Sequence, residues 1–89
     1  MSLQALRTPG PGRTVVLSGN EAIARGAMES GLAYAAAYPG SPSSEVLASL
    51  AAMARERGFH AEWSTNEKVA MEGAAAASFA GLRAITIMK

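Results

Sequence analysis

Apolar residues recur along the chain in two kinds of pattern, one typical of strands and one typical of helices. Four short apolar or alternating segments are typical of strands: 13–19, 32–38, 59–64 and 83–88. Three segments with apolar residues spaced about 3.6 positions apart are typical of helices: 20–31, 44–57 and 66–81. The resulting order, β-α-β-α-β-α-β with short links, predicts an α/β fold in which helices flank a parallel sheet.

Residues with strong capping preferences mark the ends of the predicted helices. Asn20 suits the N-cap of the first helix, and Glu21 suits its first turn. Gly31 and Gly58 suit the ends of the first and second helices. These signals support the element boundaries that the apolar pattern indicates.

The links between strands and helices carry the polar residues of greatest interest. Under the right-handed crossover rule, the links at 19–20, 39–43 and 64–67 follow the carboxyl ends of strands. Open parallel sheets bind ligands at that edge. The pattern therefore indicates where a functional site would lie.

Composition limits the chemistry that this chain can perform. The 89 residues, 49% of them hydrophobic with a net charge of +1, predict one small domain at 13–89 after a flexible tail at 1–12. The chain has no cysteine, so it forms no disulfide and ligates no iron–sulfur cluster. It also lacks aspartate, so we expect no metal site made by this chain alone. The single histidine, His60, and Trp63 lie on one predicted strand, and both are expected to have packing roles.

Several other function classes do not fit the pattern. The eight basic residues are spread from Arg7 to Lys89 and form no block, so we expect no nucleic-acid partner. No apolar run reaches the roughly 18 residues of a membrane span, and the start does not resemble a signal peptide. The glycine signatures of dinucleotide-binding and P-loop proteins are missing. The chain ends directly after a strand with no helix to cover it, so we expect either the front part of something longer or a subunit fragment that needs a partner.

The segment YPGSPSSEV allows two interpretations. As local structure, Ser41 caps the following helix, Pro42 takes its first position and Gly40 makes the turn. As a binding site, the free N–H groups of the helix start, with the hydroxyl of Ser41, Ser43 or Ser44, would hold a carboxylate or phosphate. Local pattern alone favours the first interpretation.

Glu67 stands at the mouth of an alanine-rich helix, and it also allows two interpretations. After Lys68 and Glu72 there is no further charge until Arg83, so charge is concentrated at one end of the segment. Ser64, with Glu67 three residues later, fits a capping box in which Glu67 only helps to start the helix. Local pattern alone favours this capping interpretation.

Taken together, three segments resemble one enzyme family. LSGNEAIARGAMESG, YPGSPSSEVL and EWSTNEKVAMEGAAAASFAGLRAITIMK are similar, in order and spacing, to the N-terminal domain of the large subunit of indolepyruvate:ferredoxin oxidoreductases. These enzymes belong to the thiamine-diphosphate-dependent 2-oxoacid:ferredoxin oxidoreductases. The resemblance covers about residues 14–89, and the combination of YPG[ST]PSSE with EW…NEK is specific. The departures are Ser41, where threonine is common, and Met71, where leucine is common.

The resemblance implies the thiamine-diphosphate-binding fold, with this chain as its pyrimidine-binding domain, apparently truncated. In the family, a glutamate hydrogen-bonds N1′ of the aminopyrimidine and so promotes loss of the C2 proton of the cofactor. Glu67 is the matching residue, both catalytic and cofactor-binding, and it would meet the ring nitrogen in a dry pocket. Pro39 and Asn20 are further candidate contacts to the cofactor.

The resemblance also places the substrate. In the family the YPGSPS loop approaches the 2-oxoacid, so Ser41, flanked by Gly40 and Pro42, is the candidate contact to the substrate carboxylate. Gly73 and the alanines at 74–77 would let their helix lie close to the sheet and to a partner domain.

The family's chemistry needs parts that this chain lacks. Mg²⁺ is bound by another domain, and the iron–sulfur clusters and the CoA site lie elsewhere in the complex. The resemblance implies a cytoplasmic homo- or hetero-oligomer that decarboxylates an aryl pyruvate oxidatively to an acyl-CoA and passes electrons to ferredoxin. This chain alone would be inactive. Two alternatives stay open: a truncated, non-catalytic interaction module, and the pyrimidine domain of another thiamine enzyme such as a decarboxylase.

Overall fold

Three short parallel strands form the centre of the structure, a computed structural model that describes residues 16–89. The strands are β1 (Tyr34–Ala37), β2 (His60–Trp63) and β3 (Ala84–Ile87). The helices are α2 (Gly19–Glu29), α3 (Ser44–Arg57) and α4 (Glu67–Phe79). β1 lies in the middle of the order β2-β1-β3, with Tyr34 level with His60 on one side and Ala84 on the other. The predicted class, a parallel sheet flanked by helices, is confirmed.

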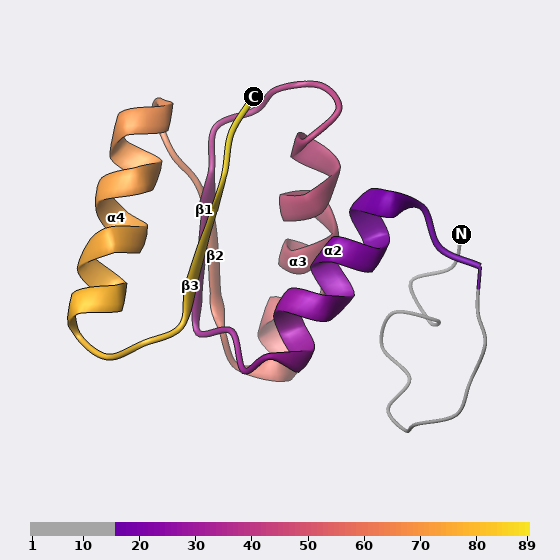
Figure 1. Cartoon of the computed structure of the whole chain (residues 1–89), viewed down its shortest axis with the longest axis horizontal. Coiled ribbons are helices and arrows are strands. Elements are labelled where there is room, and N and C mark those ends of the chain that lie inside the picture. Colours follow the sequence, from indigo (N-terminus) through magenta and orange to yellow (C-terminus); the bar gives the residue numbers. More distant parts are fainter. Residues whose placement is uncertain (1–15) are drawn as a thin grey trace.

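The two faces of the sheet are covered by different helices, with α2 and α3 on one face and α4 on the other (Figure 1). The main core lies under α2 and α3, where alternate strand residues meet the apolar sides of both helices. Leu47, Leu50 and Met53 of α3 are the largest fully buried side chains. The core cluster comprises Ala24, Leu32, Ala35, Ala37, Val46, Leu47, Leu50 and Ile87.

The face under α4 is built from small residues and one tyrosine. Ala70 and Ala74 of α4 are buried against the sheet. Gly73 lies directly over the hydroxyl of Tyr34, which occupies the place that a β-carbon on Gly73 would take. The predicted close approach of α4 to the sheet is confirmed at Gly73, because the Tyr34 hydroxyl leaves no room for a side chain there.

The strand predicted at 13–19 is not formed in the part that the structure describes. Residues 16–18 have no regular structure, and Val16 is 87% exposed. A β-branched run forms a strand where neighbouring side chains pack against it, and Val16 has no such cover. Residues 13–15 and the predicted tail at 1–12 lie outside the described residues.

Helix α2 begins differently from the prediction, because Ser18 and not Asn20 is its N-cap. The Ser18 hydroxyl accepts a hydrogen bond from the Glu21 N–H at 3.1 Å, and the Glu21 carboxylate accepts one from the Ser18 N–H at 2.8 Å. This reciprocal capping box satisfies two backbone N–H groups, which a single cap at Asn20 would not. Gly31 and Gly58 mark the helix ends as predicted, with φ angles of 90° and 76°.

The start of α3 also differs from the prediction. The helix begins at Ser44, so neither the predicted cap at Ser41 nor the first position at Pro42 is correct. The preceding residues form a turn, closed by a hydrogen bond of 2.8 Å from the Ser44 N–H to the Gly40 carbonyl. Ser41 and Pro42, which the local pattern assigned to the helix start, lie in this turn.

The capping box predicted between Ser64 and Glu67 is wrong, because Asn66 caps α4. The Asn66 side-chain oxygen accepts a hydrogen bond from the Val69 N–H at 2.9 Å. The helix begins at Glu67, which leaves Ser64 too far from the free N–H groups of the first turn. Glu67 is therefore not required as a capping-box partner.

Candidate functional site

The carboxyl ends of the three strands meet at one edge of the sheet, where the predicted site residues lie. The loop at 39–43 follows the central strand, so it lies between the link after β2 and the residues after β3. Gly40 lies against Lys89, and a β-carbon on Gly40 would be 2.8 Å from that of Lys89. Asn20 reaches the same loop and donates from its side-chain amide to the Pro42 carbonyl at 2.9 Å. The structure therefore brings Asn20 and the loop residues together.

Two serines of this loop have different surroundings. The half-buried Ser43 donates from its hydroxyl to the Gly40 carbonyl at 3.0 Å. Ser41 is exposed, and its hydroxyl makes no hydrogen bond with any described residue. Pro39 and Pro42 are exposed beside it. Ser41 is thus a loop hydroxyl that is open to a ligand, whereas Ser43 serves the loop itself.

Glu67 comes to the same edge from the opposite face of the sheet, as the first residue of α4 (Figure 1). It is half-buried, and its carboxylate makes neither a hydrogen bond nor an ion pair with any described residue. Partial burial of a carboxylate without a partner costs free energy, which its place in the first turn of a helix offsets only in part. Glu67 is therefore a carboxylate that a molecule outside residues 16–89 could engage.

Three relatives are similar in sequence to most of this chain. It is 58% identical over 79 residues, 89% of its length, to the indolepyruvate oxidoreductase subunit IorA of Thermococcus kodakarensis. It is 52% identical over 82 residues, 88% of its length, to IorA of Archaeoglobus fulgidus. Over all 89 residues it is 47% identical to IorA of Methanothermobacter marburgensis. The chain is therefore similar to IorA over nearly its whole length.

The matched segment covers nearly all of this chain but only a small part of each IorA relative. The chain spans only 12% of the T. kodakarensis subunit, 13% of the A. fulgidus subunit and 14% of the M. marburgensis subunit. No family model matches the chain, and no solved structure matches it. The predicted resemblance to the large subunit of indolepyruvate oxidoreductases is confirmed by these relatives.

A polar cluster on the α4 side of the sheet was not predicted from the IorA-like motifs. Tyr34 donates from its hydroxyl to the Glu62 carboxylate at 2.6 Å, and its ring stacks on His60 with centroids 5.3 Å apart. The hydrogen bond lowers the pKa of Glu62 and raises the pKa of Tyr34. His60 Nε2 lies 3.6 Å from Glu62 Oε1, and the His60 side chain is 58% exposed. His60 was expected to pack, and its packing is limited to the stacking contact with Tyr34. Strand register would have revealed this cluster, since residues level with each other share a face.

The Tyr34–Glu62 hydrogen bond should make stability depend on pH at both extremes. The pKa of Glu62 lies below its ordinary value of 4.5 in the folded state, so its contribution is present above that pH and lost as pH falls through the folded-state value. The pKa of Tyr34 lies above 10.0, so its contribution is present below that pH and lost as pH rises through the folded-state value. We expect the difference in free energy of unfolding between wild type and Tyr34→Phe to shrink outside these limits. Urea denaturation across pH measures it, and a difference independent of pH would contradict this account.

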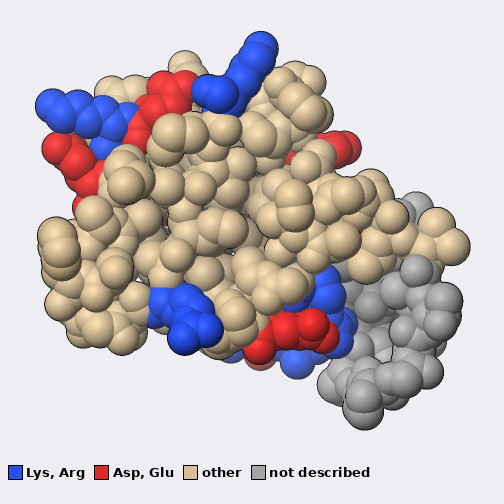
Figure 2. Space-filling view, in the orientation of Figure 1, with Lys and Arg blue, Asp and Glu red and all other residues tan. Residues whose placement is uncertain are grey.

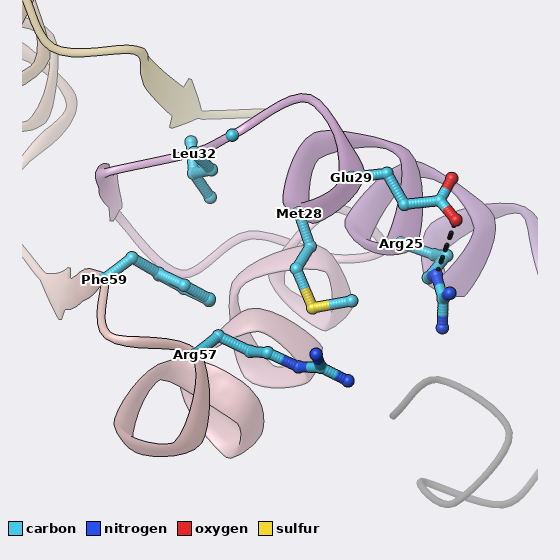
Figure 3. Close-up of a pocket in the computed structure, with 7 residues that line it drawn as sticks. Arg25, Met28, Glu29, Leu32, Arg57 and Phe59 are labelled. Atoms are coloured by element: carbon cyan, nitrogen blue, oxygen red, sulfur yellow. Dashed lines mark hydrogen bonds and ion pairs between the residues drawn. The ribbon is translucent and has the colours of Figure 1, made fainter. Parts of the chain in front are cut away.

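A separate pocket lies at the opposite edge of the sheet, where the strands begin (Figure 3). Its volume is about 340 Å³, and the C-terminal ends of α2 and α3 contribute to its walls. Met28, Leu32 and Phe59 form its apolar side, and an ion pair of 3.0 Å between Arg25 and Glu29 lies on its rim. None of the predicted site residues lines this pocket, so it is not part of the candidate site.

Residues 16–89 hold neither a cluster of metal ligands nor a helix suited to a membrane. Within this range, no group of three or more His, Asp, Glu or Cys side chains could hold a metal ion. No helix in the same range combines the length and apolar composition that crossing a membrane requires.

Proposed function

We propose that this chain is the pyrimidine-binding part of a thiamine-diphosphate-dependent 2-oxoacid:ferredoxin oxidoreductase. The observation that carries the proposal is the half-buried carboxylate of Glu67, which has no partner among the described residues at the edge where parallel sheets bind ligands. The name of the relatives, indolepyruvate oxidoreductase, supports an aryl 2-oxoacid as the substrate. The domain would span 13–89, and we place the enzyme in the cytoplasm.

The residues at this edge fit the aminopyrimidine ring of thiamine diphosphate. A carboxylate that accepts no hydrogen bond from any described residue is available to accept one from the protonated ring nitrogen N1′. Bound thiamine diphosphate supplies a carbon nucleophile for the 2-oxo group and takes up the electron pair released with CO₂. Glu67 would hold the proton at N1′, and Asn66, by capping α4, fixes where Glu67 stands. Pro39 would lie beside the cofactor.

The loop after β1 would receive the carboxylate of the substrate. Ser41 is exposed there, and its hydroxyl, which has no partner within residues 16–89, can donate to a carboxylate oxygen. Gly40 lets the loop backbone lie against Lys89 without a clash, and Pro42 follows Ser41 directly. Ser41, Gly40 and Pro42 are therefore our proposed substrate residues.

The rest of the reaction would come from other parts of a complex. The chain contains no cysteine and no aspartate, so the ligands of Mg²⁺ and of the iron–sulfur clusters that reduce ferredoxin would belong to remaining domains or a second subunit. The CoA site would also lie there. The IorA relatives are named as subunits, which supports a homo- or hetero-oligomeric enzyme.

The C-terminal half of α4 is the surface on which we place the remainder of an IorA-length polypeptide. No charged residue occurs from Gly73 to Leu82, and the charges visible over α4 gather toward its N-terminal end (Figure 2). Phe79 is 91% exposed and Leu82 is 50% exposed, although a helix this apolar is normally buried. The relatives support this occupant, because the chain spans no more than 14% of the length of the three subunits compared.

The test is the dependence of the purified complex on its cofactor. Thiamine diphosphate is removed by dialysis against a chelator of Mg²⁺, and ferredoxin reduction is then measured with indolepyruvate and CoA. We expect activity to disappear and to return when thiamine diphosphate and Mg²⁺ are added together. Mg²⁺ added alone is the matched control. Full activity without thiamine diphosphate would contradict the proposed function.

A further inference from the structure

Asn20 connects three segments that are far apart in the sequence. It is the second residue of α2, and its side-chain amide donates to the Pro42 carbonyl at 2.9 Å. The same amide nitrogen donates to the Glu45 carboxylate at 2.7 Å, in the first turn of α3. Asn20 therefore ties the start of α2 to both the loop after β1 and the helix that follows this loop.

These two bonds use all the donor capacity of the Asn20 side chain. A primary amide carries two N–H hydrogens, and both are directed at acceptors within the chain. The capping box between Ser18 and Glu21 fixes the backbone around Asn20. The side-chain amide therefore extends from a backbone position that is itself fixed. Asn20 therefore constrains the positions of the Pro42 carbonyl and the Glu45 carboxylate.

The loop gains its support at Pro42 from Asn20. The other described donor to the Pro42 carbonyl is the Glu45 N–H, at the long distance of 3.4 Å, so the bond from Asn20 is the shorter of the two. On the other side, Gly40 rests against Lys89. Ser41, the candidate substrate contact, lies between these two supports.

We propose that Asn20 is a positioning residue for the substrate loop and makes no contact with the cofactor. By holding the Pro42 carbonyl and the Glu45 carboxylate, Asn20 fixes the loop so that the Ser41 hydroxyl faces the carboxylate of a 2-oxoacid. The identity of that ligand rests on the proposed function. The positioning itself rests only on the hydrogen bonds of this chain.

The experiment compares Asn20→Ala with wild type in the complete complex. We expect the KM for indolepyruvate to rise about tenfold, which corresponds to the loss of one or two hydrogen bonds. We expect the Kd of thiamine diphosphate, titrated into the cofactor-free complex without substrate, to stay unchanged. We also expect the amides at 43–45 to exchange hydrogen faster in the cofactor-free complex. Glu29→Gln, at the far end of the same helix, is the matched control and should change none of these.

A rescue tests the geometry directly. Asn20→Asp places a carboxylate beside the Pro42 carbonyl and Glu45, and we expect a larger rise in KM because acceptors then face each other. Adding Glu45→Gln exchanges donor and acceptor and should restore part of the loss, because the amide introduced at position 45 can donate to the new carboxylate.

Each outcome separates the inference from the proposed function. A weaker Kd for thiamine diphosphate with unchanged KM and unchanged exchange would make Asn20 a cofactor contact and overturn the inference. Unchanged KM and exchange in Asn20→Ala, with a raised KM in Ser41→Ala, would overturn the inference and leave the proposed function intact. Faster exchange at 43–45 in an enzyme that does not need thiamine diphosphate would support the positioning and overturn the proposed function.

Discussion

Glu67→Gln should lower kcat of the complete complex by about 10²–10⁴-fold, the range typical of a lost proton-transfer group. Glutamine keeps the size and a carbonyl oxygen, but it removes the negative charge that holds a proton at a ring nitrogen. The fold should survive, because the Glu67 carboxylate makes no bond with any described residue. The loss of a charge in the first turn of α4 should cost no more than about 1 kcal/mol of stability.

The measurement combines ferredoxin reduction under saturating indolepyruvate with thermal unfolding of the same preparation. Glu72→Gln is the matched control, because it makes the same chemical change on an exposed residue of the same helix. We expect wild-type turnover for that control. Near-normal turnover in Glu67→Gln, in a complex that requires thiamine diphosphate, would remove Glu67 from its proposed role.

Gly73→Ala should lower the free energy of unfolding by about 1–3 kcal/mol, the usual cost of overfilling a packed interface. This direction is opposite to helix propensity, which favours alanine over glycine by about 1 kcal/mol. The hydroxyl of Tyr34 fills the position that the new methyl group needs. Either α4 moves away from β1 or Tyr34 turns and gives up its hydrogen bond to Glu62.

Two further variants separate this clash from a general effect of alanine. Gly26 lies inside α2 with no atom near the position of a β-carbon, so Gly26→Ala should stabilise the protein by about 0.5–1 kcal/mol. Combining Gly73→Ala with Tyr34→Phe should cost less than the sum of the two single changes, because the oxygen is gone. Urea denaturation gives all four values. Equal effects at the two glycines would show that the Tyr34 contact does not decide the outcome.

The sequence predicted the fold class because its strongest signals are long and redundant. Val46, Leu47, Leu50 and Met53 keep a helical spacing through α3, and all four are buried in the structure. The strand at 13–19 was predicted from its β-branched residues alone, and such a signal depends on neighbours that the local sequence does not specify.

Helix starts were harder to predict, because several residues in a row could serve as caps. Ser18 with Glu21 carries a complete capping-box signature, which outcompetes the single cap at Asn20. Ser64 with Glu67 carries the same signature, yet Asn66 is the N-cap of the helix that begins at Glu67. Local pattern does not decide between overlapping caps, because the choice depends on where the strand before the helix ends.

Some features of the candidate site could be predicted from the sequence, and others depend on the packed structure. That Asn20, Ser41 and Glu67 lie near one edge follows from element order, because links after parallel strands share an edge. The bonds from Asn20 to Pro42 and Glu45 could not be predicted, because they join residues on different helices whose relative placement depends on the packed core. The stacked pair of Tyr34 and His60 likewise depends on strand register.

The strand order determines when each pair of strands can form during synthesis of the chain. β1 is synthesised first of the three strands but lies in the middle of the sheet, so both of its edges wait for strands made later. The β1–β2 pairing closes across one helix and the β1–β3 pairing across two, which makes such contacts slow to form. α4 packs on both β1 and β3, so its contacts with the sheet are complete only after the last strand has formed. Until β3 docks, the side of α4 that packs on it stays uncovered, so Glu67 reaches its final place only when the last strand has joined the sheet.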